Sequence, residues 1–135
     1  MGDPECQTIL PMLQSDLFEI FYNCCLESLN ETEVKLSDKK SICIVLCSIG
    51  YPEEYKKDVE IQNLDNLVLK ENENIFHAGT KSKNNMILAS GGRVLNFVSK
   101  SNNFKKSRED IINLINKLDW KEGFFRRDIG YKVID

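Results

Sequence analysis

The chain has 135 residues and a mass of 15.6 kDa, which suits roughly one domain, or one domain with an appendage, and excludes two complete catalytic domains. Hydrophobic residues make up 41%, and 18 basic against 21 acidic side chains give a net charge of −3. This composition is typical of a folded protein and not of a disordered or collagen-like chain. The mildly acidic balance argues against a general nucleic-acid binder, which needs a basic face, so we expect no nucleic-acid partner.

The sequence carries no membrane or secretion signal. No run approaches the roughly 18 apolar residues of a membrane span, and the opening MGDPECQ lacks the basic and apolar regions of a signal peptide. We therefore expect a cytoplasmic protein with no membrane partner. The five cysteines contain no C-x-x-C pair and His77 is the single histidine, so we expect reduced thiols and no metal site, with a redox or zinc role as the alternative.

Two stretches have the periodicity of an amphipathic helix. Between residues 8 and 29, apolar side chains recur at spacings of three and four, which predicts one helix that needs a surface to pack on. The polar segment that begins at Asn30 places a first boundary near residue 35. Residues 104–118 repeat the helical pattern, with Asn102 or Asn103 as the N-cap and Gly123 beyond the end.

The remaining apolar runs predict strands. Ser41–Cys47 is rich in β-branched residues and predicts a strand buried on both faces, with Cys43 and Cys47 on one face as small hydrophobes. The charged segment 53–60 predicts a solvated loop or a short helix. Runs at 67–69, 75–78, 86–89 and 93–98 predict antiparallel strands joined by the turn-forming segments 70–74, 79–85 and 90–92, and the stretch 124–131 leads to a short terminal strand. Together these elements predict an α+β fold.

Two glycine-containing turns hold residues that could bind an anion. They are His77–Lys81 and Ser90–Arg93, in adjacent hairpin positions. Glycine lets backbone N–H groups approach an anion, Thr80 offers a hydroxyl donor, and Lys81 and Arg93 supply positive charge. If both turns meet at one place, they form a phosphate site. The competing interpretation is a pair of ordinary turns with solvated charges.

The sequence offers fewer candidates for catalytic groups than for anion binding. One histidine with scattered acids does not assemble a nucleophile, and neither G-x-x-x-x-G-K-[ST] nor G-x-G-x-x-G is present. His77 by itself is more typical of a packed, hydrogen-bonded residue than of a catalyst. Asp3 and Glu5 form a pair of carboxylates suited to a cation or an amine, although the sequence pattern alone favours an exposed acidic turn before a helix.

Five short segments give the chain a specific resemblance. GDPE at 2–5, GYP at 50–52, FHAGT at 76–80, GGRVL at 91–95 and RRDIG at 126–130 stand in the order and approximate spacing found at the C-terminal end of phosphoribosylamine-glycine ligase, also called glycinamide ribonucleotide synthetase. The resemblance covers essentially the whole chain. It implies an enzyme family that joins glycine to 5-phosphoribosylamine with ATP and magnesium in de novo purine synthesis, through a glycyl phosphate intermediate.

The resemblance also implies a domain arrangement. The family enzyme is much longer and has an N-terminal substrate domain and an ATP-grasp domain ahead of this segment. Residues 1–35 would be the end of the ATP-grasp domain, and residues 36–135 a small barrel-like or sandwich-like C-terminal domain. Met1 would stand where the family has phenylalanine, inside a catalytic strand, through a shortened clone, an alternative start or a broken gene. We expect the 135-residue chain alone to be inactive and to bind no ATP or magnesium by itself.

Residue roles follow from the same resemblance. In related ATP-grasp enzymes of purine synthesis, the C-terminal domain presents a lysine and an arginine to the ribose phosphate of the substrate, so Lys81 and Arg93 are expected to bind the 5-phosphate. Asp3 and Glu5 are the expected catalytic residues, near the reacting amine or the metal. The residues expected to shape the phosphate pocket are His77, Gly79, Thr80, Gly91 and Gly92.

Two alternatives to a ligase role remain. One is a free-standing anion-binding or interaction module that keeps only the fold. The other is a fragment whose exposed N-terminal helix drives self-association, because its apolar stripe has lost the surface it packs on.

Overall fold

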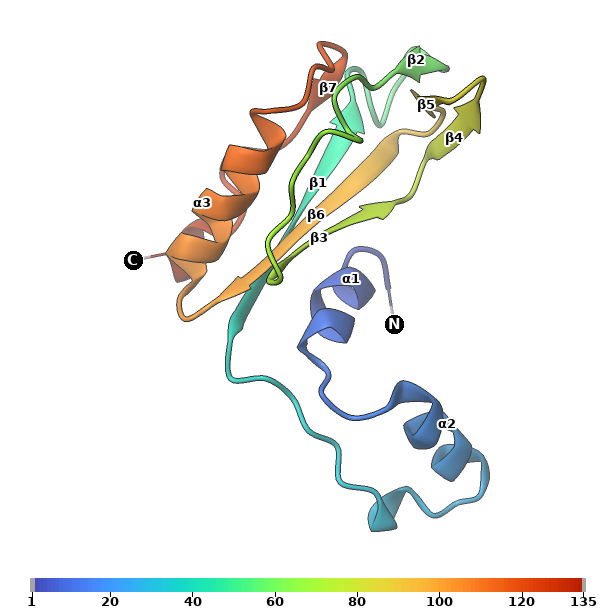
Figure 1. Cartoon of the computed structure of the whole chain (residues 1–135), viewed down its shortest axis with the longest axis vertical. Coiled ribbons are helices and arrows are strands. Elements are labelled where there is room, and N and C mark those ends of the chain that lie inside the picture. The colour runs from blue at the N-terminus through green and yellow to red at the C-terminus, as the bar shows by residue number, and fades with distance from the viewer. Residues whose placement is uncertain (1, 135) are drawn as a thin grey trace.

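A four-stranded antiparallel sheet, with a helix on each face, forms the body of the molecule (Figure 1). The structure is a computed structural model that describes residues 2–134. The sheet order is β3-β6-β1-β7, from β3 (Glu73–His77), β6 (Arg93–Ser101), β1 (Lys40–Ser48) and β7 (Gly123–Phe124). A second antiparallel sheet has the order β2-β5-β4, from β2 (Val59–Glu60), β5 (Met86–Ala89) and β4 (Thr80–Lys83). The predicted α+β class is confirmed.

The hydrophobic core lies between the large sheet and α3 (Phe104–Ile115). Alternate residues of β1 point to this face, and Ile44 and Leu46 are buried against Phe97 and Leu95 of β6. The predicted C-terminal helix is confirmed, although it ends at Ile115. Its N-cap is Asn103, whose side-chain oxygen accepts a hydrogen bond from the Lys106 N–H at 2.8 Å.

The other face of β1 is only partly covered. Cys43 and Cys47 share this face, as predicted, and Cys43 is half-buried. The covering element is α1 (Glu5–Ile9), which lies on the side of the sheet opposite α3 (Figure 1). The prediction of a strand buried on both faces is therefore too strong. A one-turn helix cannot cover a nine-residue strand, so part of this face stays open.

The single helix predicted over residues 8–29 is wrong. The chain instead forms α1, a 3-10 turn at Leu10–Met12, and α2 (Leu17–Cys25). Pro11 has no N–H for the hydrogen bond that a continuous helix needs, and Leu13 is extended and forms a bridge with Leu36. Asp16 then caps α2, because its carboxylate accepts hydrogen bonds from the next turn.

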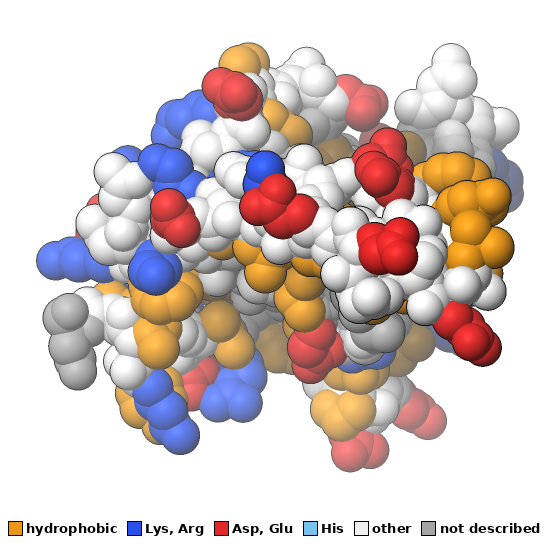
Figure 2. Space-filling view, turned by 90° about the horizontal axis from the view of Figure 1, so that it is seen from below, with side chains coloured by type: hydrophobic (Ala, Val, Ile, Leu, Met, Phe, Trp, Pro, Cys, Tyr) orange, Lys and Arg blue, Asp and Glu red, His pale blue; other side chains and the backbone are white. Residues whose placement is uncertain are grey.

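The helix α2 stands away from the sheet (Figure 1), and none of its residues is buried. Its aromatic residues Phe18 and Phe21 are 77% and 53% exposed. Figure 2, which looks at the molecule from this end, shows hydrophobic side chains exposed among acidic ones. Exposed apolar surface of this kind is typical of an interface. Within residues 2–134, no helix is both long enough and apolar enough to cross a membrane.

The other wrong predictions concern short strands. Leu67–Leu69 is a loop, with Val68 83% exposed, and the stretch after Gly130 forms a 3-10 turn at Tyr131–Val133 where a terminal strand was predicted. Conversely, β2 falls in a segment predicted as a loop or a short helix, and β4 falls in a segment predicted as a turn. The polar β4 is a strand because β5 supplies its hydrogen-bond partners, which no local pattern of side chains reveals.

A buried carboxylate anchors α3 to the loop before β3. Asp110 is 3% exposed, and its Oδ1 accepts hydrogen bonds from Lys70 Nζ at 2.9 Å and Lys106 Nζ at 2.8 Å. Burial by itself would raise the pKa of Asp110, but the hydrogen bonds from Lys106 and Lys70 outweigh burial and hold its pKa below the usual value.

We predict that Asp110→Asn lowers the free energy of unfolding at pH 7 by about 1–3 kcal/mol, the usual cost of losing charge-assisted bonds at a buried site. Because the folded-state pKa is depressed, this stability is present above the unfolded pKa of about 4 and is lost as pH falls through the folded value. Urea titrations between pH 7 and pH 3 should show that the difference in free energy of unfolding between the wild type and Asp110→Asn becomes smaller as the pH falls. Glu109→Gln, exposed on the same helix, is the control, and an Asp110→Asn effect that is equal at both ends of the range would contradict the prediction.

Candidate functional site

The two glycine turns lie in direct contact. Gly79 joins β3 to β4, and Gly91 lies between β5 and β6. The Gly79 carbonyl accepts hydrogen bonds from the N–H groups of Ser90 at 2.8 Å and Gly91 at 2.9 Å, and the Gly79 N–H donates to the Arg93 carbonyl at 3.0 Å. The N–H groups of Gly79, Ser90 and Gly91 therefore already donate to carbonyl oxygens within the junction. An anion at this place would be held by side chains and not by these backbone groups.

Glycine is required at position 79 by the closeness of the two turns. A Cβ atom there would lie 2.5 Å from the Arg93 carbonyl oxygen and 2.7 Å from the Gly91 Cα. Gly92 has a different role, since a Cβ atom on it would overlap the ring of Tyr51. The GYP and GGRVL segments thus pack against each other.

His77 and Thr80 form one polar pair across the same turn. The His77 Nδ1 and the Thr80 Oγ1 are 2.8 Å apart. His77 is exposed at the end of β3 and Thr80 begins β4. The histidine is hydrogen-bonded, as predicted, but it is exposed and not packed. Its contact fixes the orientation of the threonine hydroxyl.

Each of the two candidate cations already has a carboxylate partner. Arg93 Nη2 lies 3.2 Å from Asp3 Oδ2, and Nη1 donates to the Asp3 carbonyl at 3.1 Å. Lys81 Nζ lies 2.6 Å from Asp58 Oδ1. These four side chains are between 38% and 52% exposed, so water competes and each pair contributes at most about 1 kcal/mol.

The structure brings some expected site residues together and not others. Arg93 and Asp3, from opposite ends of the sequence, are in contact. Lys81 belongs to the three-stranded sheet and has its own acid, so it shares no partner with Arg93 among the described residues. Glu5 is exposed in the first turn of α1.

The described residues do not assemble a metal site. In residues 2–134, no three His, Cys, Asp or Glu side chains lie together in a way that could hold an ion. One or two carboxylates can contribute to a magnesium site, but Asp3 is paired with Arg93, and among the described residues no third ligating side chain lies with Asp3 and Glu5.

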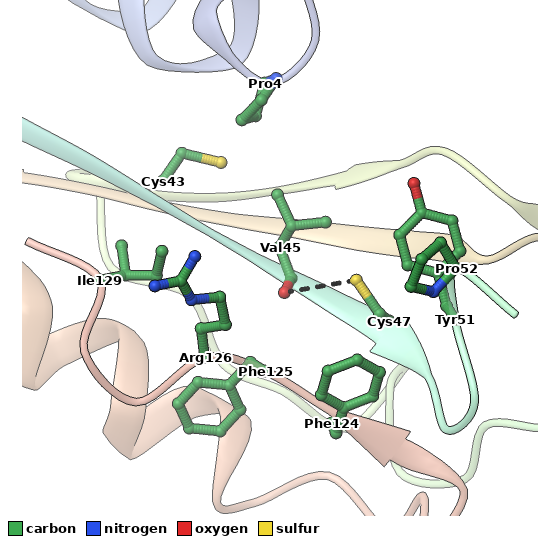
Figure 3. A pocket seen from close by; sticks show the side chains of 10 residues that line it. All are labelled: Pro4, Cys43, Val45, Cys47, Tyr51, Pro52, Phe124, Phe125, Arg126 and Ile129. Atoms are coloured by element: carbon green, nitrogen blue, oxygen red, sulfur yellow. Dashed lines mark hydrogen bonds between the residues drawn. The ribbon is translucent and has the colours of Figure 1, made fainter.

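A cavity of about 330 Å³ is lined by Pro4, which follows Asp3, and by Cys47, which is opposite Arg93 in the strand pairing (Figure 3). Its floor is the outer face of β1, formed by Cys43, Val45 and Cys47. Three of the five family-like segments, GDPE, GYP and RRDIG, contribute residues to its walls. The sequence pattern did not predict this cavity. The wall residues are Pro4, Tyr51, Pro52, Phe124, Phe125, Arg126 and Ile129.

Both cysteines of the cavity floor are neutral thiols. Burial, followed by the negative charge of Asp3, raises the pKa of Cys43 to about 12, and a hydrogen bond with Thr8 offsets only part of this. Burial also raises the pKa of Cys47, against the opposing effect of the Arg93 charge. At neutral pH these side chains act as small hydrophobic groups, as their position in the sequence suggested.

We predict that Gly79→Ala disrupts the junction of the two turns, because neither the Arg93 carbonyl nor the Gly91 backbone can move aside without breaking the hydrogen bonds between them. The expected loss is about 1–3 kcal/mol in the free energy of unfolding, as for other overpacked sites. Thermal denaturation followed by circular dichroism measures it. Ala78→Ser, at the neighbouring exposed position, should change stability little, and equal melting of the two variants would refute the argument.

The fold and the five segments define the chain as a domain of a purine-pathway ligase family. The family model described as "Phosphoribosylglycinamide synthetase, C domain" matches residues 41–132, and the chain belongs to this family.

The particular proteins it is similar to are named phosphoribosylamine–glycine ligase. The Agrobacterium fabrum protein is 37% identical over 133 residues, which cover 98% of this chain and 31% of that protein. The chloroplastic protein of Arabidopsis thaliana is 35% identical over 136 residues, which cover 98% of this chain and 25% of that protein. A crystal structure of the Thermotoga maritima ligase, at 28% identity, superposes with a TM-score of 0.69 and covers 95% of this chain and 31% of that one. The chain thus spans about a third or less of the length of the curated relatives it matches.

Proposed function

We propose that this chain is the C-terminal part of a ligase that converts ATP, 5-phosphoribosylamine and glycine into glycinamide ribonucleotide, ADP and phosphate. Residues 1–35 are assigned to the end of the ATP-grasp domain and residues 36–135 to the C-terminal domain; Met1, the position that matches a family phenylalanine, lies outside the described residues. The observation that supports this most directly is the contact between Asp3 of GDPE and Arg93 of GGRVL, across 90 residues of sequence. It joins the expected catalytic segment to the expected phosphate-binding turn.

The chain's own contribution is to hold the ribose 5-phosphate. The forked donors of Arg93 match phosphate oxygens, and Thr80 and Lys81 lie just beyond Gly79, which contacts the Arg93 backbone. Because the Arg93 guanidinium is already paired with the Asp3 carboxylate, a bound phosphate must displace that carboxylate. The phosphate contact positions the substrate amine for attack on the activated glycine, so that binding energy from a remote group lowers the barrier.

We predict that Arg93→Ala weakens the binding of ribose 5-phosphate by about tenfold, the loss of one charge-assisted contact. Lys81→Ala should weaken it less, because the lysine ammonium is a single point charge, whereas the Arg93 guanidinium offers a fork of donors. Asp3→Asn should strengthen it by removing the competing charge. Isothermal titration calorimetry at low salt measures all three, with Lys83→Ala, exposed on the same strand as Lys81, as the control. Equal affinities of the wild type and Arg93→Ala would remove Arg93 from the site.

The same titration tests the alternative, a free-standing anion-binding or interaction module. Such a module should bind inorganic phosphate as well as ribose 5-phosphate, whereas a ligase site should prefer the sugar phosphate. The exposed apolar face of α2, with Phe18 and Phe21, is the feature that favours an interaction role. In the ligase, other parts of the enzyme would cover that face.

The chemistry of ATP and magnesium is assigned to the parts of the ligase that this segment does not match. We expect the purified 135-residue chain to release no ADP when it is given ATP, magnesium, glycine and 5-phosphoribosylamine, because its matched region corresponds to only 31% of a relative such as the Agrobacterium protein. A coupled assay for ADP measures this. Ligation of glycine above the rate without protein would contradict the expectation.

A further inference from the structure

The cavity on the outer face of β1 is suited to a ligand that ribose phosphate does not resemble. Its volume of about 330 Å³ is at the lower end of the usual range for small-molecule sites. Among residues 2–134, Arg126 is the one charged residue that lines it. The remaining walls are apolar or aromatic, so a polar sugar phosphate would leave most of its hydrogen bonds unmade there.

The walls favour a flat, apolar body. In Figure 3, the rings of Tyr51 and Pro52 stand at one end of the floor and the ring of Phe124 lies below the Cys47 sulfur. The Cys43 and Cys47 thiols are uncharged, so the floor between these rings carries no competing ionic group. Aromatic walls at two sides of a narrow space are suited to stacking or edge contacts with a planar ring.

The mouth of the cavity favours an acidic group. Arg126 binds both carboxylate oxygens of Asp128, at 3.0 and 2.6 Å, and its side chain is 71% exposed. Such an exposed pair is weak, so a ligand anion can replace Asp128. The guanidinium of Arg127 lies over the Phe125 ring at 5.4 Å. Arg127 itself does not line the cavity, so Arg126 is the cation that a ligand acid can reach among the described residues.

An unpaired amide lies on the same face of the sheet. Asn96 of β6 is opposite Val45 in the β1–β6 register and is fully buried. Within the described residues, neither its Oδ1 nor its Nδ2 has a hydrogen-bond partner. A buried amide without partners costs stability, so this face of the sheet has hydrogen-bonding capacity that the chain itself does not use.

We propose that this cavity binds a small planar molecule that is mostly apolar and carries one acidic group. Its ring lies on Val45 and Cys47, between Tyr51 and Phe124, and its anion takes the place of Asp128 on Arg126. This site is separate from the proposed ribose-phosphate contacts at Arg93.

A pair of matched dyes tests the proposal. The probes are 8-anilinonaphthalene-1-sulfonate and the uncharged N-phenyl-1-naphthylamine, which share a ring system and differ in the anion. We expect saturable binding of the sulfonate at one site per chain. Arg126→Gln should weaken the sulfonate by about tenfold, as for one lost charge-assisted contact, and change the neutral dye by less than about twofold. Equal effects of Arg126→Gln on both dyes, or no effect on either, would overturn the assignment of the anion.

A second variant tests where the ring of the bound ligand lies. Val45→Phe places a phenyl group on the cavity floor and should abolish the binding of both dyes, while circular dichroism confirms that the variant is folded. Should it fail to fold, amide shifts of the wild type decide instead: addition of the sulfonate should move the resonances of Cys47, Tyr51 and Phe124.

The exposed helix α2 is the rival binding surface, and the double variant Phe18→Ser, Phe21→Ser removes its aromatic groups. Dye binding should survive this change. Loss of binding in this variant, or amide shifts confined to residues 17–26, would overturn the proposal. Lys81→Ala, which changes a residue outside the cavity lining, should leave dye binding intact, so a failure of the ribose-phosphate assignment is distinguishable from a failure of this one.

Discussion

The antiparallel pairing of β1 with β6 positions both Arg93 and the floor of the cavity. The register is regular from Lys40–Ser101 to Leu46–Leu95, and then shifts so that Cys47 is opposite Arg93. This irregularity leaves the buried Val94 as an extra residue. It also turns Arg93 toward the outer face of the sheet, where the cavity and the N-terminal segment lie. Irregularities of this kind commonly re-aim a side chain at the edge of a functional site.

The two faces of that strand pair have different tasks. The inner face packs its aliphatic side chains on α3 and contributes most of the core. The outer face is covered by only one turn of helix, and polar contacts hold that segment in place: Arg93 with Asp3, and Lys100 Nζ with the Pro11 carbonyl at 2.7 Å. Stability therefore resides in one face, while the other keeps accessible thiol, aromatic and guanidinium groups.

The cations of the phosphate site and of the cavity are held in exposed, neutralising pairs. Arg93, Lys81 and Arg126 each have an aspartate within 3.2 Å, and all three cations are more than 40% exposed. In water such pairs are weak, so an incoming phosphate or acid can exchange with the aspartate at little cost. The pairs also keep the site free of uncompensated positive charge, in line with the overall net charge of −3. The site therefore differs from an anion site that is built from backbone N–H groups, since the N–H groups of Gly79 and Gly91 form hydrogen bonds within the junction between the turns.

Local sequence determined the family, the α+β class, the helix capped by Asn103 and the long strand at 41–47, because caps and continuous apolar runs act over a few neighbouring residues. It also placed Cys43 and Cys47 on one face and brought forward the turns that contain Gly79 and Gly91. The break of the N-terminal helix at Pro11 and Asp16 also follows from local signals, a residue without an N–H and an N-cap. Tertiary structure alone decided that the polar segment Thr80–Lys83 is a strand and that Asp3 pairs with Arg93. Those outcomes depend on strand register and on partners as far as 90 residues away, and side-chain periodicity carries no information about contacts at that separation.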